Sequence, residues 1–198
     1  MNKSTIRQIY KQKRLELTKQ EVQEESKIIA DNFIKNLLPK IPDFSKKKLA
    51  FYVAANNEVD PIFILEHCQK LGNIITMPKI IPKQLMLDFK AYKIGDKLIN
   101  NKLYPKLLEP EESKQNIVPD IIFVPLVAFD KNCSRVGMGG GFYDTIIKNF
   151  RENSSKNSQK IFIGLGYEWQ NCSEISPEKQ DQSLDFIVSK NSIPSCKQ

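Results

Sequence analysis

The chain of 198 residues is short of several residue types on which enzymes commonly depend. Its single histidine, His67, argues against a Ser-His-Asp triad and against a zinc site built from several histidines. Its four cysteines lie far apart without a Cys-x-x-Cys pair, so they indicate neither a zinc site nor a redox motif, and we expect reduced thiols. Any catalysis must therefore use carboxylates, lysine, arginine, tyrosine or a bound metal ion.

Long hydrophobic runs are also missing. The longest run, Ile121 to Phe129, is interrupted by Pro125 and is far shorter than the roughly 18 apolar residues that span a bilayer. The N-terminus has no apolar segment of the kind found in secretory signals. We therefore expect a cytoplasmic protein that does not bind a membrane.

Composition and charge are those of a packed protein. Hydrophobic residues make up 40% of the chain and charged residues 27%, so we expect one domain over residues 1–198. The formal net charge is +7, but the lysines are spread along the chain and form a run only at 46–48. A solvated surface explains this pattern better than a nucleic-acid-binding face, although a phosphate-bearing small molecule would also suit it.

Hydrophobic spacing predicts two helices near the N-terminus and strands alternating with helices beyond them. The first helix, over about 4–17, has an apolar side and a basic side that carries Lys3, Arg7, Lys11 and Arg14. Thr18 and Glu21 have the spacing of a capping box and begin a second helix over about 19–38. Alternating strands and helices predict an α/β sandwich with a largely parallel sheet.

The remaining elements are predicted from apolar runs and from the turn residues that bound them. We expect helices over about 61–72 and 142–150, surface loops over 95–119 and 151–159, and strands over 49–55, 74–77 (stopped by Pro78), 85–91, 121–129, 161–165 and 186–188.

Four of the eight glycines gather between the strongest predicted strand and the helix after it, in the stretch Arg135-Val-Gly-Met-Gly-Gly-Gly-Phe-Tyr-Asp144. Ligands of open α/β sheets bind at such places, and glycines before a helix start can form a cradle of amides for an anion. Arg135 can add a bidentate phosphate contact, and Asp144 offers a hard oxygen to Mg²⁺. From these residues alone, a phosphate-binding loop and a structural glycine turn both stay open.

This stretch and the preceding Phe123-Val-Pro-Leu-Val-Ala-Phe-Asp130 resemble the signature of the 5-formyltetrahydrofolate cyclo-ligase family, also called methenyltetrahydrofolate synthetases. Further matches at Lys3 to Arg7, Met77-Pro-Lys79, Glu109-Pro110 and Gln170 extend the resemblance over nearly the whole chain. It implies a three-layer α/β/α domain and the ATP- and Mg²⁺-dependent conversion of 5-formyltetrahydrofolate to 5,10-methenyltetrahydrofolate, ADP and phosphate. We expect a monomer that binds no nucleic acid.

The resemblance also implies roles for particular residues. The residues implied to bind ATP are Lys3, Arg7 and Arg135 with the loop of Gly137, Met138, Gly139, Gly140, Gly141, Phe142 and Tyr143. Val53 and Glu58 are implied to contact the folate, and Asp181 to join Asp144 at the metal ion. We take Arg135 and Tyr143 as the candidate catalytic residues.

Each assignment has a plainer alternative. Lys3 and Arg7 are also typical of a solvated helix surface, and Asp181 of a surface carboxylate. Glu58 could instead cap the next helix, and Tyr143 could be a packing residue. The chain departs from the residues common in the family at Met138, Phe142, Thr145 and Gln180. Phe142 stands where the family often has tyrosine. Without the tyrosine hydroxyl one hydrogen bond is lost, so we expect altered affinity and intact chemistry.

Two other classes of function fit parts of the sequence. A nucleic-acid-binding module would use the net charge of +7, but it needs clustered basic residues with exposed aromatic residues. A kinase or sugar-phosphate enzyme on a similar sheet would use the same glycine loop. Salt-dependent binding of an oligonucleotide tests the first class, and a substrate assay tests the second.

Overall fold

The computed structural model describes residues 1–81, 84–153, 159–173 and 175–195. Its elements in chain order are α1 (Lys3–Leu15), α2 (Lys19–Asn32), η1 (Phe33–Leu37), η2 (Leu38–Lys40), η3 (Phe44–Lys46), β1 (Lys48–Ala50), α3 (Ile62–Lys70), β2 (Ile74–Ile81), β3 (Met86–Ala91), β4 (Leu98–Asn100), β5 (Leu108–Pro110), β6 (Ile121–Val124), β7 (Ala128–Phe129), β8 (Arg135–Val136), α4 (Phe142–Asn153), β9 (Ile161–Leu165), η5 (Glu168–Gln170) and β10 (Phe186–Val188).

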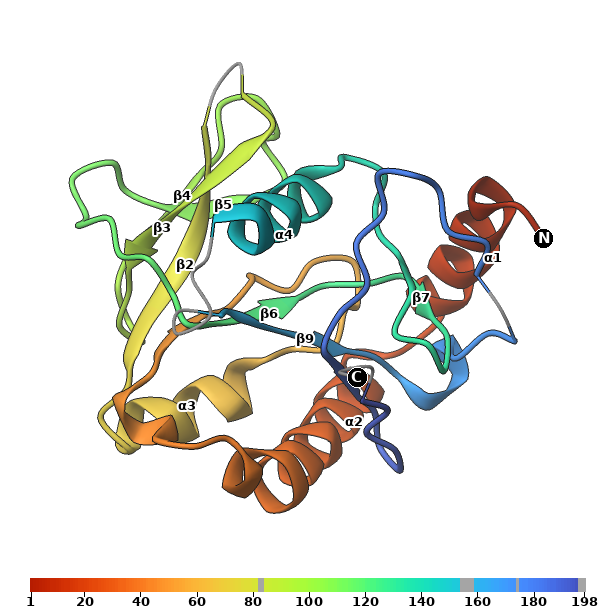
Figure 1. The fold of residues 1–198 in the computed structure, drawn as a ribbon, viewed down its shortest axis with the longest axis horizontal. Helices are drawn as coiled ribbons and strands as arrows, with labels where there is room; N and C mark the ends of the chain where they lie inside the picture. The colour runs from red at the N-terminus through yellow and green to blue at the C-terminus, as the bar shows by residue number, and fades with distance from the viewer. Residues whose placement is uncertain (82–83, 154–158, 174, 196–198) are drawn as a thin grey trace.

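A six-stranded sheet forms the middle layer, in the strand order β10-β9-β6-β1-β2-β3. The strands from β10 to β2 pair in parallel, and β3 returns antiparallel beside β2. Helices α2 and α3 cover one face of the sheet and α4 covers the other, while α1 lies beyond the sheet, next to β7 (Figure 1). The predicted three-layer α/β/α arrangement with a largely parallel sheet is confirmed.

Apolar side chains fill the space on both faces of the sheet. On one face Phe33 and Leu65 pack against Phe123 of β6, and on the other Ile147 of α4 packs against Phe162 of β9. Each side chain of this size stabilises the fold by about 1.5–3 kcal/mol when it is fully buried. The two cores hold the loops at the strand ends on a rigid base.

Pro78 does not end the second strand, contrary to the sequence prediction. β2 continues to Ile81, and Pro78 pairs with Phe89 of the antiparallel strand β3. The carbonyl of Thr76 accepts a hydrogen bond from the Phe51 amide on the β1 side, so the nitrogen of Pro78, two residues on, faces that same side. Because β1 ends at Ala50, no strand in the described part of the chain pairs with Pro78 on that side, and the hydrogen bond that proline cannot donate is not needed.

Two predicted strands are longer than the observed ones. The strand expected over 49–55 ends at Ala50, and the strand expected over 121–129 divides into β6 and β7 around Pro125. β7 then leaves the sheet to pair with β8 in an antiparallel hairpin. Residues 49–52, 121–124 and 126–129 are nevertheless buried, because the chain passes directly from the sheet into the packed loops of the site.

The connection expected as a loop over 95–119 contains the hairpin of β4 and β5. β5 places Glu109 beside Lys79 of β2, with 2.7 Å between Lys79 Nζ and Glu109 Oε1. Glu109 also accepts hydrogen bonds from the Asn101 side chain and the Ile80 amide. The two short matches at Met77-Pro-Lys79 and Glu109-Pro110 therefore come together in space as one buried polar cluster.

The helices near the N-terminus differ from their predicted bounds by a few residues. Thr18 and Glu21 form the predicted capping box of α2, whose line continues through η1 and η2 to Lys40. The loop expected over 151–159 lies partly outside the described residues, and its first three residues are the last turn of α4. No helix within the described ranges has both the length and the apolar character that a membrane span requires.

The cysteines correct one expectation. Cys68 and Cys172 are free thiols, as predicted, whereas Cys133 is disulfide-bonded. The expectation of reduced thiols is wrong for Cys133 because spacing along the sequence does not report distances in the fold.

Candidate active site

The predicted site residues gather where β1 and β6 end. The segment after β1 carries Val53 and Glu58, and the segment after β6 carries the hairpin and the glycine loop that leads into α4. α1 closes this edge through Ile6, which packs against Ala128 and Val136 of the hairpin. Ligands of open α/β sheets bind at such carboxyl ends of strands, so the fold places these loops as the sequence predicts.

The glycine loop adopts the conformations that its sequence suggests. Gly139 and Gly141 have positive φ angles of 100° and 70°, which residues with a side chain rarely adopt. Among the described residues, none accepts a hydrogen bond from the backbone amides of 138–141. The loop therefore presents unpartnered donors in front of the α4 N-terminus, where an anion is favoured.

Arg7 of α1 lies against this loop. Its Nε donates a 2.8 Å hydrogen bond to the carbonyl of Gly137, and its guanidinium would be 3.6 Å from a Cβ added at Gly139. The two terminal nitrogens of Arg7 donate no hydrogen bond within the described part of the chain. Arg7 is thus anchored by one nitrogen and can offer the other two to a ligand.

Lys3 lies one helical turn before Arg7 and pairs with carboxylates near the end of the chain. Its Nζ forms an ion pair with Asp181 and lies 3.7 Å from Glu178. The structure therefore brings Lys3 to the predicted metal ligand Asp181. Neither side chain is the freely solvated charge that the plainer alternative described.

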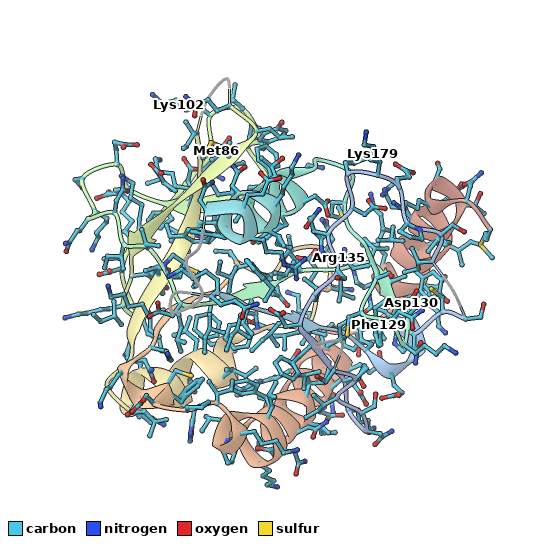
Figure 2. All side chains as sticks on the ribbon, in the orientation of Figure 1. Met86, Lys102, Phe129, Asp130, Arg135 and Lys179 are labelled. Carbon is cyan, nitrogen blue, oxygen red and sulfur yellow. The ribbon has the colours of Figure 1, made fainter. Side chains whose placement is uncertain are left out.

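Arg135 is the first residue of β8 in the hairpin and is buried, deeper in the molecule than the exposed Lys179 (Figure 2). Its Nη2 is 3.0 Å from Asp144 Oδ1, while its buried Nε has no partner among the described residues. Burial lowers the pKa of Arg135, and the negative charges of Asp144 and Asp181 oppose this effect. A buried guanidinium with an unused donor is suited to an incoming anion.

Asp181 lies in the segment that contacts Asp144. The amide of Gln182, directly after Asp181, donates a 3.1 Å hydrogen bond to Asp144 Oδ1. In each carboxylate one oxygen is engaged and the other accepts no hydrogen bond from the described residues. Within these ranges no three His, Cys, Asp or Glu side chains converge, so a cation here would need further ligands from water or substrate.

The predicted folate residues lie in the segment between β1 and α3. Val53 is partly exposed and packs against the core, and Glu58 is buried, with its Oε2 accepting a hydrogen bond from the Ala55 amide. Burial raises the pKa of Glu58, while Arg14 and the Ala55 amide act in the opposite direction.

Tyr143 is the second residue of α4 and is influenced by charges from both predicted binding regions. Burial raises the pKa of its hydroxyl, the charge of Glu58 raises it further and Arg135 lowers it. Tyr143 is therefore within electrostatic reach of both Glu58 and Arg135. Its position is compatible with substrate contact as well as with packing.

Part of the signature stretch has a structural role. The carboxylate of Asp130 is fully buried and accepts hydrogen bonds from the amides of Asn132, Ser134 and Ile175. Phe129 fills the space beside Gly166, where an added Cβ would lie 2.8 Å from its ring. Gln170 likewise ties Tyr167 to Val127 through buried hydrogen bonds. These residues shape the hairpin that carries the site.

Sequence analysis gives no role to Arg14, which it groups with the other cations on the basic side of the first helix. Arg14 is 1% exposed and contacts the segment after β1, the segment after β6 and the glycine loop. The signal for its role is helical spacing: residues 3, 7 and 14 lie on one face of α1.

Comparisons with known proteins identify the family. The model of the 5-formyltetrahydrofolate cyclo-ligase family matches residues 1–190. The 5-formyltetrahydrofolate cyclo-ligase of Haemophilus influenzae is 32% identical over 149 residues, which cover 72% of this chain and 75% of that protein. The Escherichia coli protein of the same name is 27% identical over 150 residues, covering 73% and 79%.

A solved structure supports the same conclusion for the fold. The NMR structure of the 5,10-methenyltetrahydrofolate synthetase of Aquifex aeolicus matches with a TM-score of 0.78 at 24% identity, covering 100% of this chain and 94% of that one. Together with the family match over residues 1–190, this shows that the chain belongs to the 5-formyltetrahydrofolate cyclo-ligase family.

Proposed function

We propose that this chain cyclises 5-formyltetrahydrofolate to 5,10-methenyltetrahydrofolate with ATP as co-substrate, the activity for which its relatives are named. The observation that carries the proposal is that anion-binding groups and a buried carboxylate lie at the same edge of the sheet. A buried arginine and unpartnered loop amides suit a polyphosphate, and the buried carboxylate of Glu58 acts together with Arg135 on the hydroxyl of Tyr143.

The reaction needs an activator because an N5 formamide is a poor electrophile. Attack of the formyl oxygen on the γ-phosphorus of ATP forms an O–P bond and releases ADP. The N10 nitrogen then attacks the formyl carbon and loses its proton, and the C–O bond breaks with release of phosphate. These steps need positioning and charge neutralisation more than a protein nucleophile, which suits a chain with one histidine.

On the ATP side, we assign phosphate binding to Lys3, Arg7, Arg135 and the loop from Gly137 to Tyr143. Arg7 offers two unused nitrogens and Arg135 an unused Nε, and the loop amides supply further donors. Charge-assisted hydrogen bonds of this kind are roughly twice as strong as neutral ones. Arg135 is the residue placed to stabilise charge that develops on the transferred phosphoryl group.

Two carboxylates beside the glycine loop fit a bound Mg²⁺. Asp144 and Asp181 would hold it, since each offers one free carboxylate oxygen and Mg²⁺ favours one or two carboxylates with phosphate and water oxygens. When bound, the ion would neutralise phosphate charge. Lys3 and Arg135 neutralise the two carboxylates and hold them in place.

On the folate side, we assign binding of the pterin to Val53 and Glu58. Each Glu58 oxygen keeps a lone pair for a ring N–H beyond its protein contact, and Val53 offers an apolar surface to the ring. Tyr143 interacts electrostatically with both Glu58 and Arg135, and we assign it to the region of the formyl group. A cytoplasmic location, a monomeric state and the lack of nucleic-acid binding stay predictions from the sequence.

An absorbance assay tests the proposed function. Purified protein with 5-formyltetrahydrofolate, ATP and Mg²⁺ should develop methenyl absorbance and release one ADP per product. A non-hydrolysable ATP analogue should give no product. Product formed at the full rate without nucleotide would disprove the role of ATP.

A further inference from the structure

The guanidinium of Arg14 is buried at the centre of three loops. Its Nε donates a 2.8 Å hydrogen bond to the Asn56 carbonyl, and its Nη1 donates a 3.2 Å bond to the Leu126 carbonyl. Its Nη2 is 3.9 Å from the Met138 sulfur in the glycine loop. One side chain of α1 thus joins the segment after β1, the segment after β6 and the loop assigned to phosphate.

Arg14 also faces the carboxylate of Glu58. The distance from Arg14 Nη1 to Glu58 Oε1 is 3.5 Å, and both side chains are at least nine-tenths buried. A buried carboxylate is costly when it is charged, so its ionised form depends on such a partner. Within the described ranges, the other ionisable groups that interact electrostatically with Glu58 are the hydroxyls of Tyr52, after β1, and Tyr143, in α4.

We propose that Arg14 is a positioning residue of the reaction: it keeps the Glu58 carboxylate charged and aimed at the pterin, and it sets the distance between the folate segment and the phosphate loop. The proposal rests on the proposed function, in which Glu58 binds the folate. Arg14 itself is not placed to contact ATP, because its nitrogens are directed to the Asn56 and Leu126 carbonyls, to Met138 and to Glu58.

The nature of Met138 supports this arrangement. The position contacts a buried cation, and a thioether can lie beside a guanidinium as a weak acceptor, whereas a second cation would repel it. Met138, one of the residues that depart from the family pattern, therefore permits the contact between Arg14 and the glycine loop.

The test uses Arg14→Met, Arg14→Lys and Glu58→Gln, with Lys11→Met as the control for loss of a cation from α1. Arg14→Met should raise the KM for 5-formyltetrahydrofolate at least 10-fold and leave the KM for ATP within about twofold. Burial raises the pKa of Glu58 and Arg14 opposes this, so loss of Arg14 should raise that pKa further and move the acid limb of kcat/KM for the folate to higher pH. Arg14→Lys should restore part of both effects.

Two outcomes decide the proposal. Glu58→Gln should abolish the acid limb, and adding Arg14→Met to it should raise the folate KM little further. If Arg14→Met lowers only the melting temperature, or raises both KM values equally without moving the acid limb, Arg14 is a structural residue and the proposal fails. If Arg14→Met does not fold, Arg14→Lys carries the same test through its pH profile. A wild-type chain without ATP-dependent product would instead refute the proposed function.

Discussion

Arg135 and Asp144 flank the glycine loop and close it with an ion pair, in which Arg135 Nη2 lies 3.0 Å from Asp144 Oδ1. The pair fixes the two ends of the loop relative to each other. It also leaves the buried Nε of Arg135 and one oxygen of Asp144 without a protein partner in the described ranges. One end of the loop can therefore take an anion and the other a cation.

The first prediction concerns Arg135→Ala. Loss of a charged phosphate contact should cost about 1.5–3 kcal/mol, which raises the KM for ATP about 10- to 150-fold. Steady-state kinetics with each substrate varied in turn checks this, with Arg151→Ala at the far end of α4 as the control. A fall in folate affinity with an unchanged KM for ATP would show that Arg135 is misassigned.

The second prediction concerns Gly139→Ala, compared with Gly95→Ala. Both glycines have positive φ, 100° and 94°, so each alanine should destabilise the fold by a similar amount, about 1–2 kcal/mol. Only Gly139 faces the site, where it lies beside Arg7. Calorimetry should show loss of ATP binding for Gly139→Ala and normal binding for Gly95→Ala. Equal ATP binding by the two variants would make Gly139 a purely structural glycine.

The third prediction concerns the metal. Asp144→Asn and Asp181→Asn should each raise the Mg²⁺ concentration needed for half-maximal activity, because each removes a charged ligand. The effects should be non-additive in the double variant, since both act at one ion. Titration of activity with Mg²⁺ checks this, with Asp185→Asn as a control on the nearby strand end. A dependence on Mg²⁺ that Asp181→Asn leaves unchanged would assign Asp181 to Lys3 alone.

The fourth prediction concerns the buried pair of Lys79 and Glu109. Lys79→Met should destabilise the fold by about 3–5 kcal/mol because it leaves Glu109 as an uncompensated buried charge. Lys79→Met with Glu109→Leu should recover much of that loss. Urea unfolding measures both, and an additive double variant would mean that the two side chains do not stabilise each other.

The sequence predicts the layers of the fold well because they follow from apolar spacing, which the sheet and helices must satisfy. It misplaces the ends of strands at Pro78 and Pro125, because whether a proline is tolerated depends on which neighbouring strand has already ended. It also leaves out the β4–β5 hairpin, whose short strands are stabilised by the contact of Glu109 with Lys79 and not by a periodic pattern.

The candidate site is likewise predictable only where its residues lie close together in the sequence. The glycine loop, Arg135 and Asp144 are contiguous in the sequence, so their proximity is predictable. The positive φ angles of Gly139 and Gly141 fit both a phosphate-binding loop and a structural glycine turn. Arg14 is missed because helical spacing places it on the face of Lys3 and Arg7 but does not show that its side chain is buried. Its burial depends on loops that are distant in the sequence, which pack over that face in the fold.

The central claim, that ATP activates the formyl oxygen, is tested most directly with 5-formyltetrahydrofolate labelled with ¹⁸O in the formyl group. The proposed reaction breaks the C–O bond after the O–P bond has formed, so the label should leave in inorganic phosphate, one labelled oxygen per methenyl product. Label recovered in water, with unlabelled phosphate, would contradict the account.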